Sequence, residues 1–143
     1  MTVIARACLI ILVCGFGLTA CGLDKLVHPP AAQGREALDA FVLAMQLEEF
    51  SAAAVHLVPD NRQAFLEQFA TLDKDLHIIE ARIAEMVIGA EGRRAEVALE
   101  MDYYLLPSVT VKTFRFDHTW IYYEASGQMP ARYQIVTPFS RFP

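Results

Sequence analysis

The chain has 143 residues, 55% of them hydrophobic, with 12 Lys and Arg against 17 Asp and Glu and a formal net charge of −5. This length suits one domain with a core of its own and is short for two. The acidic balance argues against nucleic acid and anionic lipid headgroups as partners. The sequence shows no Cys/His cluster with metal spacing and no Gly-rich phosphate loop, so it predicts no metal and no cofactor.

The first twenty residues have the pattern of an export signal. An apolar run begins near Val3, contains Arg6 and is too short to span a bilayer. It ends in Leu18-Thr19-Ala20-Cys21, which resembles the bacterial lipobox. The alternatives are an uncleaved signal anchor or a buried hydrophobic helix, but Gly15 and Gly17 weaken a permanent helix. We therefore expect residues 1–20 to be removed as a lipoprotein signal peptide and Cys21 to be lipidated.

The resemblance to lipoproteins also implies a location. Several acyl chains on Cys21 would hold the protein to a membrane, because each buried methylene contributes about 0.8 kcal/mol. Residue 22 is Gly rather than the Asp that retains proteobacterial lipoproteins in the inner membrane. The expected location is the cell envelope, on the periplasmic face of the outer membrane if the source is diderm. Because Cys8 and Cys14 would be removed, the mature domain would have no thiol and would depend on its core for stability.

The next segment, residues 21–34, is expected to be a lipidated tether, and residues 35–143 the folded domain. The tether contains Pro29 and Pro30 and has no sustained periodicity. Apolar residues then follow helical spacing and predict a first helix over about 35–49. Their positions are Leu38, Phe41, Val42 and Met45.

Two further helices are expected before the sheet. A short one covers Ser51–Leu57 and is stopped by Pro59. Asp60 then resembles an N-cap, with Gln63 at the third helical position as in a capping box, and this third helix ends near Leu72.

After Asp75 the apolar residues recur at every second position, which indicates half-buried antiparallel strands. The expected strands are 76–88, 95–104, 109–123 and 132–137. Gly89 and Gly92 can supply the positive φ that the first hairpin loop requires. The strand over 109–123 is long, so we expect it to bend or bulge.

This order of elements resembles the NTF2-like (cystatin-like) superfamily over residues 35–139. Leu38-Asp39-Ala40-Phe41 stands early in the first helix, Thr119-Trp120 in the long strand and Tyr133-Gln134-Ile135-Val136 in the closing strand. The resemblance implies an α+β cone of three N-terminal helices packed on a curved four-stranded antiparallel sheet, with a pocket at its open end. The superfamily contains isomerases, dehydratases, transport factors and non-catalytic accessory domains, so the fold does not choose a function.

An aromatic face on the long strand supplies the candidate pocket. Its residues, with one tyrosine from the preceding strand, are Tyr103, Phe114, Phe116, His118, Trp120 and Tyr122. An imidazole among aromatic side chains could act as an acid or base. The simpler interpretation is a core histidine hydrogen-bonded to backbone or to a tyrosine. We interpret His56 and His77 as surface or cap positions.

Asp102, Glu100 and Glu96 form an acidic row on the polar face of the preceding strand. Two carboxylates can divide acid and base roles when their environments separate their pKa values, but regular spacing on a polar face more simply indicates a solubilising surface. In the ketosteroid isomerase branch a tyrosine and two aspartates act within the cone. The first helix here has Phe41 and no tyrosine, so we assign no catalytic residue.

The expected function is therefore a lipid-anchored, non-catalytic binding or accessory module. Its partners would be the membrane, through acyl chains on Cys21, and a small apolar ligand or an envelope protein. The alternatives are an isomerase- or dehydratase-type enzyme that uses His118 or Asp102 in the cone, and a subunit of an envelope assembly. The apolar tail with Phe139 and Phe142 either packs back on the domain or is offered to a partner.

Overall fold

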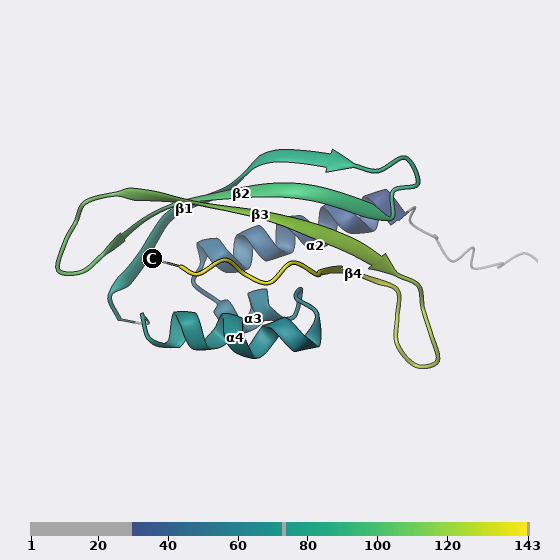
Figure 1. The fold of residues 1–143 in the computed structure, drawn as a ribbon, viewed down its shortest axis with the longest axis horizontal. Helices are drawn as coiled ribbons and strands as arrows, with labels where there is room; N and C mark the ends of the chain where they lie inside the picture. Colours follow the sequence, from purple (N-terminus) through teal and green to yellow (C-terminus); the bar gives the residue numbers. More distant parts are fainter. Residues whose placement is uncertain (1–29, 73, 143) are drawn as a thin grey trace, which may run out of the picture.

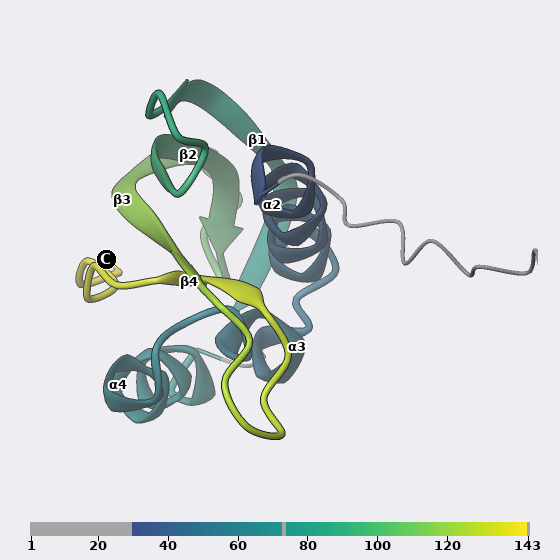
Figure 2. The same ribbon diagram turned by 90° about the vertical axis from the view of Figure 1, so that its right-hand side faces the viewer.

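The structure, a computed structural model, describes residues 30–72 and 74–142 (Figure 1). In this part of the chain three helices precede a four-stranded antiparallel sheet with the strand order β1-β2-β3-β4. The end-on view shows a strongly twisted sheet with α2 on one side of it and α3 and α4 below (Figure 2). The predicted fold class, α+β with three helices packed on a four-stranded antiparallel sheet, is confirmed.

Helix α2 covers Pro30–Gln46 and begins earlier than the sequence led us to expect. Residues 30–34, which we assigned to the tether, are helical. Proline is well suited to the first turn of a helix, because the N–H that it lacks would have no helical acceptor there. The buried stripe of α2 includes Leu38, Phe41 and Met45 as predicted. The signal peptide, Cys21 and the remainder of the tether lie outside the described residues.

Helix α2 also ends earlier than predicted, because the chain turns at Glu48. This residue has a φ of 58°, a left-handed conformation that favours glycine. The N–H groups of Glu48 and Glu49 donate back to the carbonyls of Met45 and Ala44 at 3.1 and 2.8 Å. These bonds close the helix in a Schellman motif.

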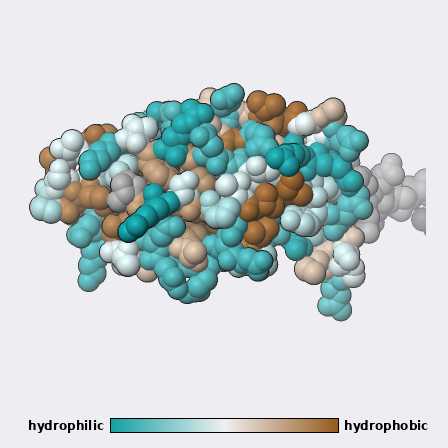
Figure 3. All heavy atoms as spheres, in the orientation of Figure 1, coloured by the Kyte–Doolittle hydropathy of each residue, from teal (hydrophilic) through white to brown (hydrophobic). Residues whose placement is uncertain are grey.

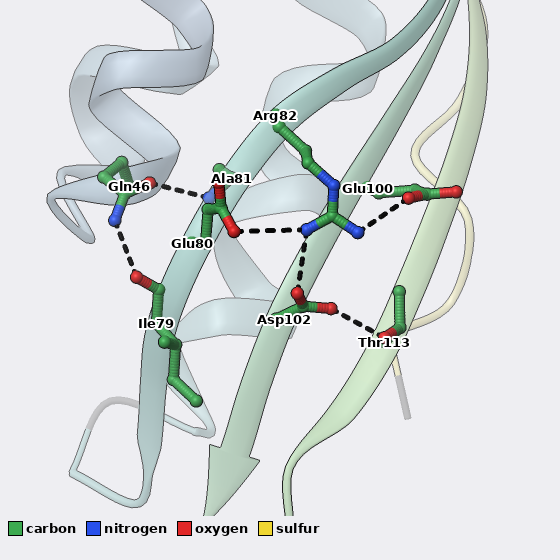
Figure 4. A network of polar contacts seen from close by, with 8 residues as sticks. All are labelled: Gln46, Ile79, Glu80, Ala81, Arg82, Glu100, Asp102 and Thr113. Atoms are coloured by element: carbon green, nitrogen blue, oxygen red, sulfur yellow. Dashed lines mark hydrogen bonds and ion pairs between the residues drawn. The ribbon is translucent and has the colours of Figure 1, made fainter.

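Side chains at the end of α2 pair with the backbone of the edge strand β1, Leu76–Ile88. Glu48 Oε1 accepts the N–H of Ile78 at 2.8 Å. Gln46 accepts the N–H of Ala81 at 2.6 Å and donates to the carbonyl of Ile79 at 2.9 Å (Figure 4). Backbone groups that an edge strand would otherwise leave open are therefore satisfied by the helix.

Helices α3 and α4 cover Phe50–Ala54 and Pro59–Ala70. The predicted capping by Asp60 and Gln63 is wrong. Val58 is the N-cap of α4 and makes no side-chain capping bond, while Pro59 occupies the first turn instead of only stopping the previous helix. Asp60 lies in the first turn, where its negative charge suits the helix dipole.

The remaining strands are β2 (Arg94–Leu105), β3 (Lys112–Tyr123) and β4 (Arg132–Ile135). Strands β2 and β3 pair without a register shift from Arg94↔Ile121 to Tyr103↔Lys112. The bulge expected in the long strand is therefore absent from this pairing. The irregularities lie in β1, where the register to β2 shifts between Ile78 and Glu80 and between Ile83 and Glu85. The second edge, β4, is covered by a parallel bridge between Leu57 and Ile135.

The core lies between the helices and one face of the sheet. Its buried hydrophobic residues all fall between Leu38 and Phe142. The largest fully buried side chains are those of Trp120, Tyr103, Phe41, Phe65, Phe69 and Phe116. Among the helices of residues 30–142, we find none that is both long and apolar enough to cross a membrane.

Candidate functional site

The six candidate pocket residues share the inner face of the sheet. Phe116, His118 and Trp120 of β3 and Tyr103 of β2 are at most 2% exposed, and Phe114 and Tyr122 are half-buried. Register explains this, because Phe116 pairs with Leu99 and His118 with Val97 on the same face of β2. Phe116, His118 and Trp120 pack in a row, and His118 and Trp120 also contact Phe41 of α2, so this face is part of the core.

His118 stacks on Phe116, with ring centroids 4.5 Å apart and planes 9° from parallel. Its Nδ1 lies 3.0 Å from the carbonyl oxygen of Phe116. A carbonyl only accepts, so the neutral ring donates its proton from Nδ1 to this oxygen. Nε2 is buried and has no hydrogen-bond partner among the described residues. This is the core histidine that the simpler interpretation predicted.

Burial lowers the pKa of His118 from 6.5 to about 4, because the charged ring would lose its hydration. The unfolded chain binds this proton at a higher pH than the folded chain does. The stability that the neutral, buried ring contributes is therefore present above pH 6.5 and is lost as the pH falls toward 4. The lost free energy amounts to about 2 kcal/mol at pH 5. Lowering the pH therefore destabilises the folded protein through His118.

We expect His118→Gln to lower the free energy of unfolding by about 1 kcal/mol at pH 7.5, through the lost stacking and the altered hydrogen bond. The difference from the parent should vanish or reverse at pH 5, because glutamine does not titrate. Urea unfolding of both proteins from pH 7.5 to 5 tests this. His56, whose pKa is also lowered by burial, is present in both proteins and cancels. A parallel fall of the two curves would contradict the assignment.

His56 lies in a different place from the one predicted. Its ring is half-buried, 5.9 Å from the ring of Trp120 and 6.1 Å from that of Phe41. It therefore borders the core instead of occupying a simple surface or cap position. His77 is half-buried at the start of β1 and stacks on Tyr104 at 4.9 Å. Periodicity could not place His56, because this residue lies in the irregular segment between α3 and α4.

The C-terminal tail packs back on the domain. Phe139 lies 4.3 Å from Phe116 and 5.0 Å from Phe65, measured between ring centroids. Phe142 lies 4.7 Å from Tyr103, and its N–H donates to Gln68 Oε1 at 2.8 Å. The tail thus fills the space between β3 and α4, next to three of the candidate pocket residues, Tyr103, Phe114 and Phe116.

Two cavities border the candidate residues only at their margins. A slot of about 10 Å³, room for one water molecule, lies between α2 and the sheet and is lined by Trp120, Gly34 and Tyr133 among others. An open groove of about 350 Å³ is lined mainly by outward-facing residues of the sheet, Arg115, Asp117 and Glu96 among them, and also touches His118. Neither cavity brings the six aromatic-face residues together around a ligand.

The acidic row on the outer face is held by arginines. The Arg82 guanidinium lies 2.8 Å from Glu100 and 2.8 Å from Asp102 (Figure 4). Asp102 also accepts the hydroxyl of Thr113 at 2.6 Å, and Arg115 lies 3.6 Å from Glu100. The partners come from β1 and β3 on either side of β2, so the sequence spacing along β2 could not reveal them.

This network keeps Asp102 ionised. The hydrogen bond from Thr113, and then the one from Arg82, lowers the pKa of the Asp102 carboxyl. The Thr119 hydroxyl similarly lowers the pKa of Glu96. A general acid needs a raised pKa instead. Within residues 30–72 and 74–142, no group of His, Cys, Asp and Glu could hold a metal ion.

No family model and no curated protein matches the sequence. Among solved structures, a SEC-C motif-containing protein from Psychrobacter arcticus is similar, with a TM-score of 0.57 and 10% identity over 76% of this chain and 60% of that one. This chain thus spans about three fifths of its length. Two candidate polyketide cyclases align less closely. The one from Xanthomonas campestris pv. campestris has a TM-score of 0.45 and 14% identity, covering 76% of this chain and 92% of its own.

The other, from Pseudomonas putida KT2440, has a TM-score of 0.37 and 18% identity, covering 71% of this chain and 89% of its own. At such low identities the first of the three likenesses shows a shared fold and transfers no activity.

Proposed function

We propose that this chain is a lipid-anchored protein of the cell envelope whose folded domain is a non-catalytic binding or accessory module. One observation carries the second half of the proposal. His118 and Asp102, either of which the enzyme alternative would use, lie on opposite faces of the sheet, so neither can serve as the partner of the other. An acid and a base must converge on one reacting atom. These two side chains are instead separated by the sheet itself.

The environment of each group also disfavours catalysis. His118 is 2% exposed and stacked on Phe116, so little of its ring is accessible to a substrate in the groove that it borders. Asp102 is ionised and engaged by Arg82 and Thr113. A binding module needs neither group to be free. Its ligand would be a small apolar molecule or another envelope protein.

The lipid anchor is supported by the sequence Leu18-Thr19-Ala20-Cys21 and by the spacing of Cys21 from the fold. Helix α2 begins at Pro30. A short linker would therefore join the acylated cysteine to the folded domain and keep the domain close to the membrane.

We expect Cys21→Ser to abolish incorporation of a labelled fatty acid when the whole chain is expressed in a diderm bacterium. The thiol of Cys21 is the acylation site, so the variant should also leave the membrane fraction or stay unprocessed. Gel fluorography of labelled cells and the mass of the purified protein measure both effects.

Cys14→Ser is the matched control, because it removes a thiol from the same apolar run and should keep the label. Label that persists on Cys21→Ser would overturn the lipoprotein assignment. A membrane-bound, unlabelled parent that retains residues 1–20 would indicate an uncleaved signal anchor instead.

A further inference from the structure

One end of the domain is built from three segments that are distant in sequence. Helix α2 begins there, beside the β1–β2 loop at 89–93 and the β3–β4 loop at 124–131 (Figures 1 and 2). A methyl group built on Gly92 would lie 3.2 Å from Cβ of Ala31, so the first loop touches the start of α2. The β2–β3 loop lies at the opposite end of the sheet (Figure 1).

The end at which α2 begins is the part of the domain nearest to Cys21 along the chain. Cys21 is nine residues before Pro30, and an extended chain spans at most ~3.6 Å per residue, or about 30 Å. The start of α2 must then stay within about 30 Å of the bilayer. Helix α2 itself, with 17 residues, adds about 25 Å along its axis before the other end of the fold is reached.

Exposed apolar side chains occur at both ends, so they do not by themselves show which end meets a membrane. The β2–β3 loop exposes Leu106, Val109 and Val111, and brown atoms gather at that end of the molecule (Figure 3). The end at which α2 begins, here called the tether end, exposes Ile88, Tyr123 and Met129, which are 42%, 39% and 57% exposed. The point of attachment favours the end at which α2 begins, because that end always lies within about 30 Å of the bilayer, whereas the other end has no such restraint.

The tether end also has the residue types of a membrane interface. The Arg132 guanidinium lies 5.9 Å from the ring of Tyr123, and that of Arg93 lies 5.7 Å from the ring of Tyr122. Tyrosine and arginine combine an apolar body with a polar tip, which suits the headgroup region. Residues 87–94 and 122–132 contain three arginines against two glutamates, so this end lacks the acidic excess of the whole chain and is not repelled by phosphate.

We propose that the membrane-facing end, defined as residues 87–94 and 122–132, rests on the lipid surface in which Cys21 is anchored. This inference depends on the proposed lipid anchor. The β2–β3 loop then faces away from the bilayer, and the outer face of the sheet stands roughly upright and open to the surrounding compartment.

The test couples a chain that begins at Cys21 to a maleimide lipid in phosphatidylcholine vesicles. This chain contains the entire described core, and Cys21 is its single thiol. Tryptophan is introduced as Met129→Trp or Val109→Trp, in loops at opposite ends. The native Trp120 is 1% exposed and gives both variants the same background. With brominated lipids in the vesicles, the added emission of Met129→Trp should fall at least twofold, and that of Val109→Trp should not change.

Stronger quenching of Val109→Trp, equal quenching of both, or quenching of neither would overturn this inference. The attachment is chemical, so the result is independent of natural acylation. Failure of the lipoprotein assignment is read separately, from the fatty-acid label on the whole chain.

Discussion

Trp120→Ala should lower the free energy of unfolding by about 3–5 kcal/mol, the usual cost of removing a buried tryptophan or phenylalanine. The ring is 1% exposed and lies between sheet and helix, 5.8 Å from the ring of Phe41. Its cross-strand neighbours are Ala95 and Ile135. Alanine at position 95 is too small to fill the vacated space. A large part of a typical stability of 5–15 kcal/mol would therefore be lost.

Urea unfolding followed by circular dichroism measures this effect. Tyr123→Ala is the control, because it removes an aromatic ring from the same strand where it is 39% exposed, and we expect its effect to be under about 1 kcal/mol. The indole Nε1 of Trp120 is buried without a hydrogen-bond partner in the described part of the chain, so the loss is due to packing. A melting temperature within about two degrees of the parent would show that this face is not the core.

Phe139→Ala should cost a comparable amount, about 3–5 kcal/mol, although it is only four residues from the end of the sequence. The ring is 8% exposed and lies edge-on to Phe65 and against Phe116. Its removal leaves a cavity between β3 and α4, lined by aromatic rings. Aromatic pairs add about 0.5–1.5 kcal/mol beyond the area they bury.

Phe139→Leu preserves much of the volume and should cost less than half as much as the alanine variant, while Ser140→Ala at the exposed neighbouring position should be nearly neutral. Thermal and urea unfolding of the three variants provide the measurement. If Phe139 fills an apolar space between β3 and α4, Phe139→Ala will also bind an apolar dye that the parent excludes. An unchanged stability would mean that the tail leaves the core in solution.

Much of the fold could be predicted because periodicity is a local property. Alternation along β2 and β3 identified the inner face correctly, with Phe116, His118 and Trp120 all buried. Helical spacing likewise found the stripe of α2. Two errors occurred at prolines, because proline both ends helices and is well suited to their first turn. Pro30 and Pro59 were interpreted as breaks, whereas each lies in the first turn of a helix.

The position of the bulges was another error, for a different reason. Strand length suggested a bulge in the segment 109–123, but the shifts lie in β1, where Ile78 and Ile79 stand side by side and interrupt the alternation. That pair was a visible signal. The irregular backbone there is held by Gln46, which forms hydrogen bonds to the backbone of Ile79 and Ala81 from a helix more than thirty residues away.

The sequence by itself determined the order of the elements, the face that each strand buries and the prediction of a lipidated Cys21, because these depend on residues that are neighbours along the chain. Only the tertiary structure decided what the candidate residues can do. It placed Arg82 beside Glu100 and Asp102, closed the aromatic face with Phe139, and packed the ring of His118 against Phe41 of α2. Cross-strand register and tail packing join residues that are distant along the chain, and local periodicity contains no information about such contacts.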